Sequence, residues 1–215
     1  MADIEEKLKA LGFSEGPIYE TILTTLNPDG SGNAAPMGVV MTSPSTLEIK
    51  PFKTSTTYRN LKKFGKACVN VTSDPGTYLA TAFKEDGLPG FHVPNIDGEL
   101  RLDHSDAHIF IESDSSDESE RRATFTCRVL SVEVANSKPR VFSRGRASAV
   151  EAIIHATRIK VFLEEGPRER VESLIKRFCE CKDVVDRVSP PESTESRVIG
   201  ELDRLIGYWR KGTFR

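Results

Sequence analysis

The 215-residue chain has no long apolar run, no internal repeat and no excess of charge of one sign. It contains no stretch of 18 apolar residues, so the sequence predicts no membrane-spanning helix. Its 30 basic and 32 acidic residues nearly cancel, which argues against nucleic acid as a partner, because such proteins carry a basic field. The polar, acidic N-terminus does not resemble a secretory signal, so we expect a cytoplasmic protein.

Cysteine and histidine are also scarce, with four of each in the chain. Cys68 and Cys127 fall in strand-like runs and are expected to be small buried hydrophobic residues. Cys179 and Cys181 are separated by a single residue, which is not the usual spacing of a zinc or thioredoxin site. We therefore expect all four cysteines to have structural roles.

Two histidines, His104 and His108, are four residues apart and could bind a metal if they shared one face of a helix. The segment has no glutamate in the zinc-hydrolase pattern and no clear third ligand. We therefore interpret it as a polar surface and predict no metal site.

Short apolar runs separated by turn residues dominate the first two thirds of the chain. They predict six strands, at residues 18–26, 34–42, 46–52, 67–72, 99–111 and 123–135. Helical spacing predicts a helix at 3–11, a second at 58–64 and a helical turn at 77–83. In the last strand the apolar alternation slips between Val129 and Val132, which indicates a β-bulge.

Polar segments interrupt this pattern. Residues 84–98, rich in glycine and proline, are expected to form an irregular loop. The polar and acidic run 112–122 is expected to be a mobile loop between two strands, and a lid is one role open to it.

The pattern changes after residue 135. Residues 136–145 are expected to be a linker, and three amphipathic helices are predicted beyond it, at 146–162, 168–181 and 196–209. Strands followed by helices indicate an α+β protein, and short antiparallel strands suit a small closed barrel. We therefore predict a barrel domain at 1–135 and a C-terminal helical module at 136–215.

Four consecutive hydroxyl residues precede the predicted helix at 58–64. Such side chains can cap free backbone N–H groups, and these groups and the helix dipole favour a negative ligand. Positively charged side chains lie on either side, so a phosphate would meet hydroxyls, amides and a guanidinium together. The candidate phosphate-binding residues, here called the hydroxyl cluster, are Lys53, Thr54, Ser55, Thr56, Thr57 and Arg59. An ordinary helix cap that binds nothing is the alternative interpretation.

Three motifs occur in order along the chain: Ala35-Pro36-Met37-Gly38-Val39, Ser55-x-Thr57-x-x-Asn60-Leu61 and Val69-Asn70-Val71. Together they resemble the FMN-binding split barrel of flavin reductases and related flavoproteins, over roughly residues 18–135. The run from Phe142 to Arg158 resembles the C-terminal module of an uncharacterised, archaeal-type branch of these proteins. The resemblance implies an antiparallel split β-barrel with a C-terminal helical module, and FMN as the cofactor.

Carried over residue by residue, the resemblance implies three groups of flavin contacts. Ser55 and Thr57 would hold the phosphate, with Thr54 and Thr56 as neighbours. One part of the isoalloxazine ring would lie against the backbone of Met37, Gly38 and Val39, and another against Asn70, Val71 and Thr72. The resemblance also implies a homodimer with each flavin near the subunit interface.

The physical needs of FMN agree with this placement. The ring needs N–H and C=O groups along its edge, and a strand backbone beside Gly38 can supply them because no side chain blocks close approach. Flavin chemistry belongs to the cofactor, so no catalytic acid or base is required and none is evident.

Three functions stay open at this point. The first is an oxidoreductase in which bound FMN takes hydride or electrons from a nicotinamide, although the sequence has no dinucleotide fingerprint. The second is a non-catalytic protein that holds FMN for storage or sensing. The third is an interaction role without flavin. The substrate also stays open, since Met37-Gly38 replaces the bulkier or hydroxyl-bearing residues of many reductases.

The predicted helix at 146–162 carries Glu151, His155 and Arg158 at helical spacing. A structural Glu–His–Arg network is the interpretation that we favour. The alternative is that this helix presents His155 or Arg158 to the cofactor or the substrate.

Overall fold

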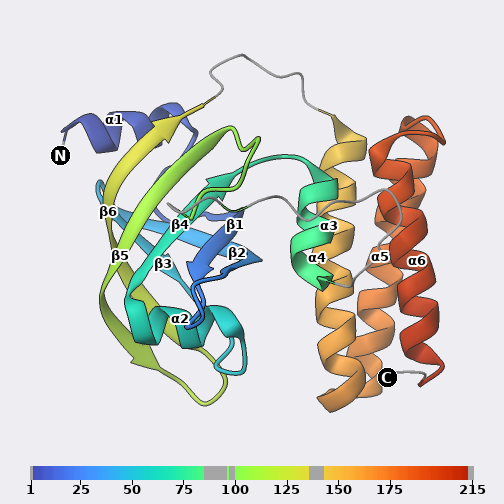
Figure 1. Ribbon diagram of the computed structural model, residues 1–215. Helices are drawn as coiled ribbons and strands as arrows, with labels where there is room; N and C mark the ends of the chain where they lie inside the picture. Colours follow the sequence, from blue (N-terminus) through green and yellow to red (C-terminus); the bar gives the residue numbers. More distant parts are fainter. Residues whose placement is uncertain (1, 85–95, 97–99, 136–142, 213–215) are drawn as a thin grey trace. The chain divides into compact units, whose positions relative to one another are not determined.

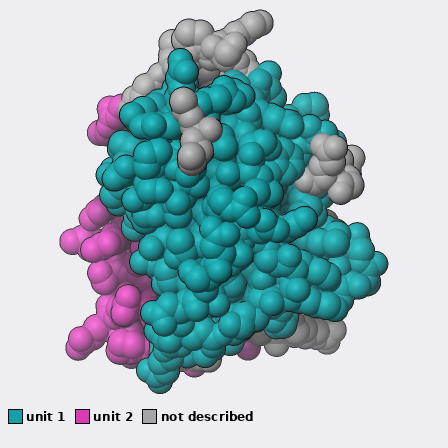
Figure 2. Space-filling view, turned by 90° about the vertical axis from the view of Figure 1, so that its left-hand side faces the viewer, with its two compact units in different colours: residues 1–72, 94–138 teal, residues 73–93, 139–215 magenta. Residues whose placement is uncertain are grey.

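The computed structural model describes residues 2–84, 96, 100–135 and 143–212 (Figure 1). The chain forms two compact units, residues 1–72 with 94–138 and residues 73–93 with 139–215 (Figure 2). The first unit contains all six strands, and the second is built from helices. The division into domains at residue 135 stays a prediction.

The first unit is a closed barrel with the strand order β1-β2-β3-β6-β5-β4, in which all neighbours are antiparallel. Its strands are β1 (Ile18–Leu26), β2 (Gly32–Ser43), β3 (Thr46–Ile49), β4 (Lys66–Val71), β5 (Ala107–Glu118) and β6 (Ala123–Val134). Ile22 of β1 faces Pro36 of β2 on one side and Asn70 of β4 on the other, which closes the ring of strands. The predicted α+β fold with an antiparallel barrel is confirmed.

Alternate residues of the six strands point into the barrel and fill it with apolar side chains. Two helices cover its ends, α1 (Ala2–Ala10) and α2 (Thr56–Phe64), which lie at opposite ends of the barrel in Figure 1. Each contributes one fully buried leucine, Leu8 and Leu61, to the same core. The interior is therefore packed, and the outer surface of the barrel is left for binding a ligand.

The prediction of a mobile loop over residues 112–122 is wrong. β5 continues to Glu118 and pairs with β6 as far as Ala123, so the acidic run forms one arm of a hairpin. The side chains of this arm are exposed from Asp114 onward, so no apolar alternation marks it as a strand. The strand predicted over 99–111 correspondingly begins only at Ala107.

The bulge predicted in β6 is confirmed. Phe110 pairs with Ser131 while Ile111 pairs with Val129, so Leu130 is the extra residue. The bulge restores the inward direction of the later apolar side chains after the slip in the sequence.

The second unit contains four helices among its described residues: α3 (Pro75–Phe83), α4 (Arg144–Glu165), α5 (Arg168–Val188) and α6 (Thr194–Arg210). The three helices predicted at its C-terminal end are confirmed, each longer than expected. The helical turn predicted at 77–83 is a nine-residue helix whose N-cap is Asp74. The predicted loop at 84–98 and linker at 136–145 lie mostly outside the described residues.

The barrel core predicts a large effect of one substitution in β6. Phe125 is 1% exposed and its ring lies 6.0 Å from that of Tyr58. Phe125→Ala leaves a cavity among rigid neighbours, so we expect the free energy of unfolding to fall by about 3–5 kcal/mol in urea titrations. The control Leu130→Ala, at a position 41% exposed, should change it by only about 0.5 kcal/mol. Equal losses would contradict this view of the core.

Candidate functional site

The hydroxyl cluster lies at the N-terminus of α2, and Ser55 is the N-cap of that helix. Its backbone is extended, its Oγ accepts a hydrogen bond from the Tyr58 N–H at 3.1 Å, and its hydroxyl donates to the Phe52 carbonyl at 2.7 Å. No acidic residue occupies the first turn of α2. The capping interpretation of Ser55 is therefore confirmed, and a phosphate contact of its hydroxyl stays a prediction.

A buried network of amides and hydroxyls joins α2 to the hairpin of β1 and β2. The Asn33 amide donates to Thr57 Oγ1 at 3.2 Å and to Thr25 Oγ1 at 3.0 Å. The Asn60 amide donates to Thr25 Oγ1 at 3.1 Å and to Asn27 Oδ1 at 2.8 Å. Thr57 is 2% exposed, so its hydroxyl lies beneath the helix start, where it fixes the position of the first turn.

The other members of the cluster are more accessible. Thr54 and Arg59 are exposed, and the Arg59 guanidinium donates to the Thr54 carbonyl at 3.1 Å and to Thr56 Oγ1 at 3.0 Å. The guanidinium is thus folded back against the first turn of α2. This places a permanent positive charge beside the hydroxyls and the free N–H groups, as the sequence led us to expect.

Lys53 has a partner that the sequence analysis missed. Its Nζ lies 3.1 Å from Glu118 Oε2, at the end of β5. The same carboxylate lies 2.8 Å from Lys62 Nζ and accepts a hydrogen bond from the Tyr58 hydroxyl at 2.9 Å. The hydrogen bonds from Lys62, Lys53 and Tyr58 lower the pKa of Glu118 to about 2. These groups are far apart in the sequence and come together only in the fold. In the sequence, Glu118 is one of several acidic residues in the run 112–122.

On β2, residues Met37, Gly38 and Val39 lie opposite Thr21, Glu20 and Tyr19 of β1. Val39 is fully buried in the barrel core, so its neighbour Gly38 faces outward. A Cβ atom at Gly38 would lie 2.9 Å from Ile18 Cγ2, a side chain that is 68% exposed. The outer face of Gly38 is therefore partly covered by the Ile18 side chain, which is itself largely exposed and has room to move.

Asn70 of β4 is fully buried, and its side chain has a structural role. Its amide donates to the Ile22 carbonyl and to Thr24 Oγ1, both at 3.0 Å, and its Oδ1 accepts from the Leu102 N–H at 2.9 Å. These bonds tie β4 to β1 and to the segment before β5. Val71 and Thr72 are partly buried at the end of β4, and a flavin contact by these residues stays a prediction.

The two parts of the predicted flavin site, the hydroxyl cluster and the residues of β2 and β4, both lie next to β1. Thr25 of β1 bonds to the residues under the α2 start, and Thr21 of β1 faces Met37. These two threonines are four residues apart, a distance of about 13 Å along a strand. The fold therefore brings the hydroxyl cluster and the β2 and β4 residues to one region of the barrel.

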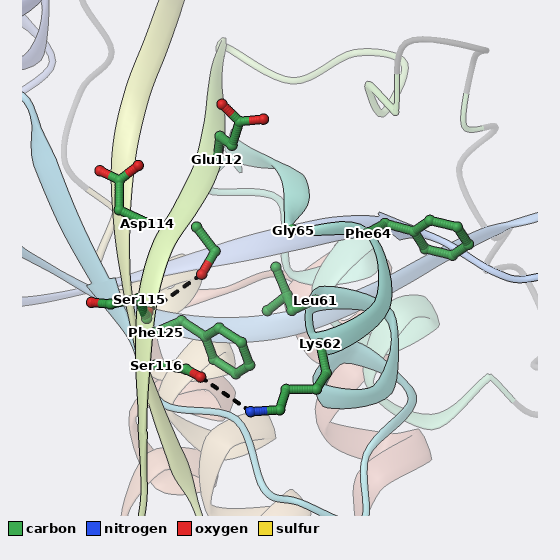
Figure 3. A pocket seen from close by; sticks show the side chains of 10 residues that line it. Leu61, Lys62, Phe64, Gly65, Glu112, Asp114, Ser115, Ser116 and Phe125 are labelled. Atoms are coloured by element: carbon green, nitrogen blue, oxygen red, sulfur yellow. Dashed lines mark hydrogen bonds between the residues drawn. The ribbon is translucent and has the colours of Figure 1, made fainter.

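A cavity of about 410 Å³ lies between α2 and β5 (Figure 3). It is lined by Leu61, Lys62, Phe64, Gly65, Glu112, Ser113, Asp114, Ser115, Ser116 and Phe125. In Figure 3 Lys62 extends toward Ser116, whose hydroxyl accepts its hydrogen bond at 3.3 Å. The cavity contains none of the predicted flavin-binding residues, since it lies along the C-terminal half of α2.

The interpretation of His104 and His108 as polar surface is wrong for the second residue. His108 lies on β5, is 8% exposed, and its Nε2 is 3.1 Å from the Leu102 carbonyl oxygen. Within the described residues no group of three or more His, Cys, Asp or Glu side chains is arranged to hold a metal ion. Cys68 and Cys127 are buried as predicted.

His155 lies inside the helical unit and is 4% exposed. Its Nε2 is 3.3 Å from Glu151 Oε1, and its Nδ1 has no hydrogen-bond partner among the described residues. Burial, more than its charged neighbours, lowers the pKa of His155. The geometry agrees with a structural Glu–His pair, and a contact of His155 or Arg158 with a cofactor stays a prediction.

Comparison with solved structures shows the class of fold. The chain is similar to the FMN-bound protein MM1853 from Methanosarcina mazei, with 24% identity and a TM-score of 0.71 over 92% of this chain and 98% of that one. It matches the styrene monooxygenase flavin reductase of Pseudomonas putida S12 at 16% identity and a TM-score of 0.47, over 55% and 82% of the two chains. The predicted barrel with a C-terminal helical module is thus found in a solved protein.

The family can also be stated. Residues 19–136 match the family described as "Protein of unknown function (DUF447) N-terminal domain", and the chain belongs to this family. MM1853 carries the same family designation. No helix in the described part of the chain is long and apolar enough to cross a membrane.

The contacts of Glu118 predict an unusual titration. Its pKa is near 2 in the folded chain and near the ordinary value of 4.5 in the unfolded one, so the unfolded state binds more protons between these values. Its contribution to stability is therefore complete above pH 4.5 and is lost as the pH falls toward 2. Carboxylate ¹³C shifts followed by NMR should show this low pKa, and Lys62→Met should raise it. A midpoint near 4.5 in the wild-type chain would contradict the geometry.

Proposed function

We propose that this protein binds FMN, with the phosphate at the start of α2 and the ring against the outer surface near Gly38. The observation that carries the proposal is the arrangement at α2: hydroxyls, free N–H groups and the Arg59 guanidinium converge at a helix start without acidic residues. The fold that the chain shares with an FMN-bound protein supports it.

The proposed position of the phosphate rests on backbone N–H groups in the first turn of α2 that lack an acceptor within the helix. The N–H groups of Thr56 and Thr57, in the first turn, have no acceptor within the helix. Ser55 caps the Tyr58 N–H, which leaves these two groups and the dipole for an anion. Arg59 lies against the same turn and supplies the positive charge that a phosphate prefers.

The proposed position of the isoalloxazine ring rests on the distance along β1 between Thr25 and Thr21. The span of about 13 Å along β1 between Thr25 and Thr21 is within the length of FMN, whose phosphate and ring lie at opposite ends of the ribityl chain. A phosphate held at α2 therefore brings the ring to the level of Met37 and Gly38. The Ile18 side chain over Gly38 is largely exposed and can move aside, and the backbone there can then pair with the edge of the ring, which a side chain at position 38 would prevent.

The second part of the proposal is the activity. FMN, when bound, supplies hydride and electron transfer, and the protein needs only to hold and orient it and to control access. We propose an oxidoreductase that accepts hydride from a nicotinamide and works as a homodimer with the flavin near the subunit interface. Non-catalytic FMN storage or sensing is the alternative, because no side chain of the described site is positioned as a catalytic acid or base.

Removal of the cluster hydroxyls should separate FMN from riboflavin. In Ser55→Ala/Thr57→Ala we expect FMN affinity, measured by flavin fluorescence, to fall about 10- to 100-fold, because the Ser55 hydroxyl is lost and the buried Thr57 hydroxyl no longer fixes the first turn of α2. Riboflavin affinity should change little, since riboflavin has no phosphate.

The matched control removes a helix cap elsewhere. Ser193→Ala deletes the N-cap hydroxyl of α6, which accepts from the Ser196 N–H at 3.2 Å, and should leave both affinities unchanged. Equal loss of FMN and riboflavin in the double variant would place the phosphate elsewhere. A colourless purified protein that takes up no FMN would leave only the interaction role.

Anaerobic mixing with NADH or NADPH tests the activity separately. Hydride transfer to bound FMN should bleach its absorbance near 450 nm, on the order of one nicotinamide consumed per flavin. A chain that binds FMN tightly but is bleached by neither nicotinamide, while dithionite bleaches it, would favour storage or sensing.

A further inference from the structure

The Glu118 carboxylate contacts two lysines, Lys53 just before α2 and Lys62 on α2. It ends β5, and its carboxylate contacts Lys53 Nζ at 3.1 Å, Lys62 Nζ at 2.8 Å and the Tyr58 hydroxyl at 2.9 Å. The Glu118 side chain is 34% exposed, so water screens these contacts in part. One of the two lysines belongs to the hydroxyl cluster.

The hairpin tip is held in place by bonds that do not involve this carboxylate. The Lys53 N–H donates to the Arg121 carbonyl at 3.0 Å, and the Ala123 N–H donates to the Pro51 carbonyl at 3.2 Å. The Arg122 guanidinium also lies 3.9 Å from the centre of the Phe52 ring. Because the backbone is anchored independently, the charge of Glu118 can be removed without releasing the tip.

The two lysines differ in their distance from the helix start. Lys53 directly precedes the four hydroxyl residues, whereas Lys62 is seven residues beyond Ser55, about 10 Å along the helix axis. Lys53, which directly precedes the hydroxyl residues in the sequence, is therefore the lysine that we assign to both the carboxylate and an anion at the first turn. Lys62 and Tyr58 can keep their bonds to the Glu118 carboxylate when the Lys53 side chain moves to an anion.

We infer that Glu118 determines the affinity and selectivity of the hydroxyl cluster by competing with a bound phosphate for Lys53. The inference rests on the proposed function, because it concerns the same phosphate site. A dianionic phosphate draws Lys53 from the carboxylate, and a ligand without that charge does not. Glu118 thus weakens the binding of phosphate-bearing ligands such as FMN and leaves the binding of riboflavin unchanged.

Glu118→Gln tests the inference, since glutamine keeps the shape and the acceptor for Tyr58 but removes the charge. We expect FMN to bind about two- to fivefold more tightly to the full chain, the range that a partly exposed ion pair spans. Riboflavin affinity should stay constant. The control is Glu112→Gln, which removes an equal charge from the same strand, where Glu112 pairs with Arg128 at 3.0 Å, and should not change FMN binding.

A second variant makes the test independent of small changes in folding. Lys53→Met should weaken FMN binding, and Glu118→Gln should bring no gain when Lys53 is absent. Loss of the gain in this double-mutant cycle identifies Lys53 as the group for which Glu118 competes. Thermal melting of each variant shows that the barrel remains folded.

The outcomes distinguish the inference from the function on which it rests. If the wild-type chain binds FMN and Glu118→Gln binds it equally or less tightly, the inference is overturned and the proposed function stands. A gain that persists in the Lys53→Met background, or that Glu112→Gln reproduces, also overturns it. If the wild-type chain binds no FMN, the proposed function fails and the inference fails with it.

Discussion

The arrangement of the candidate site depends on a buried hydroxyl that two amides share. Thr25 Oγ1 accepts hydrogen bonds from Asn33 and from Asn60, and through them β1, β2 and α2 are held in a fixed relation. Each unsatisfied group in such a network costs about 1–3 kcal/mol, so its members must all be present together. The first turn of α2 is therefore rigid. Its backbone N–H groups already have fixed directions before a ligand binds, so binding does not have to order them.

This rigidity has an electrostatic consequence. A helix start without acidic residues, next to Lys53 and Arg59, concentrates positive charge on a small surface. In the folded chain each of these cations has an internal acceptor: Arg59 bonds to Thr54 and Thr56, and Lys53 pairs with Glu118. An anion that binds here thus replaces the internal acceptors of Lys53 and Arg59. Its affinity is the difference in free energy between the contacts that it makes and the internal contacts that are lost.

Much of the fold could be predicted from the sequence, because apolar periodicity and turn residues mark the buried faces directly. The bulge at Leu130 was predicted on that ground, and so were the helices α4 to α6. The outer arm of β5 could not be, since both of its faces are exposed and nothing apolar alternates. For the site, the hydroxyl cluster was visible as a local pattern, but its partners Asn33 and Glu118 lie 24 residues from Thr57 and 65 residues from Lys53.

The packed interior decides where a flavin can lie. A six-stranded barrel filled by side chains such as Leu23, Phe125 and Ile109 has no room for a planar three-ring system. The ring site proposed above is therefore on the outer surface, beside Gly38 and the largely exposed Ile18. A strand surface can cover only one face of a flat ligand, and the other face stays in water unless a further protein surface reaches it. In the proposed homodimer, a second chain would supply that cover.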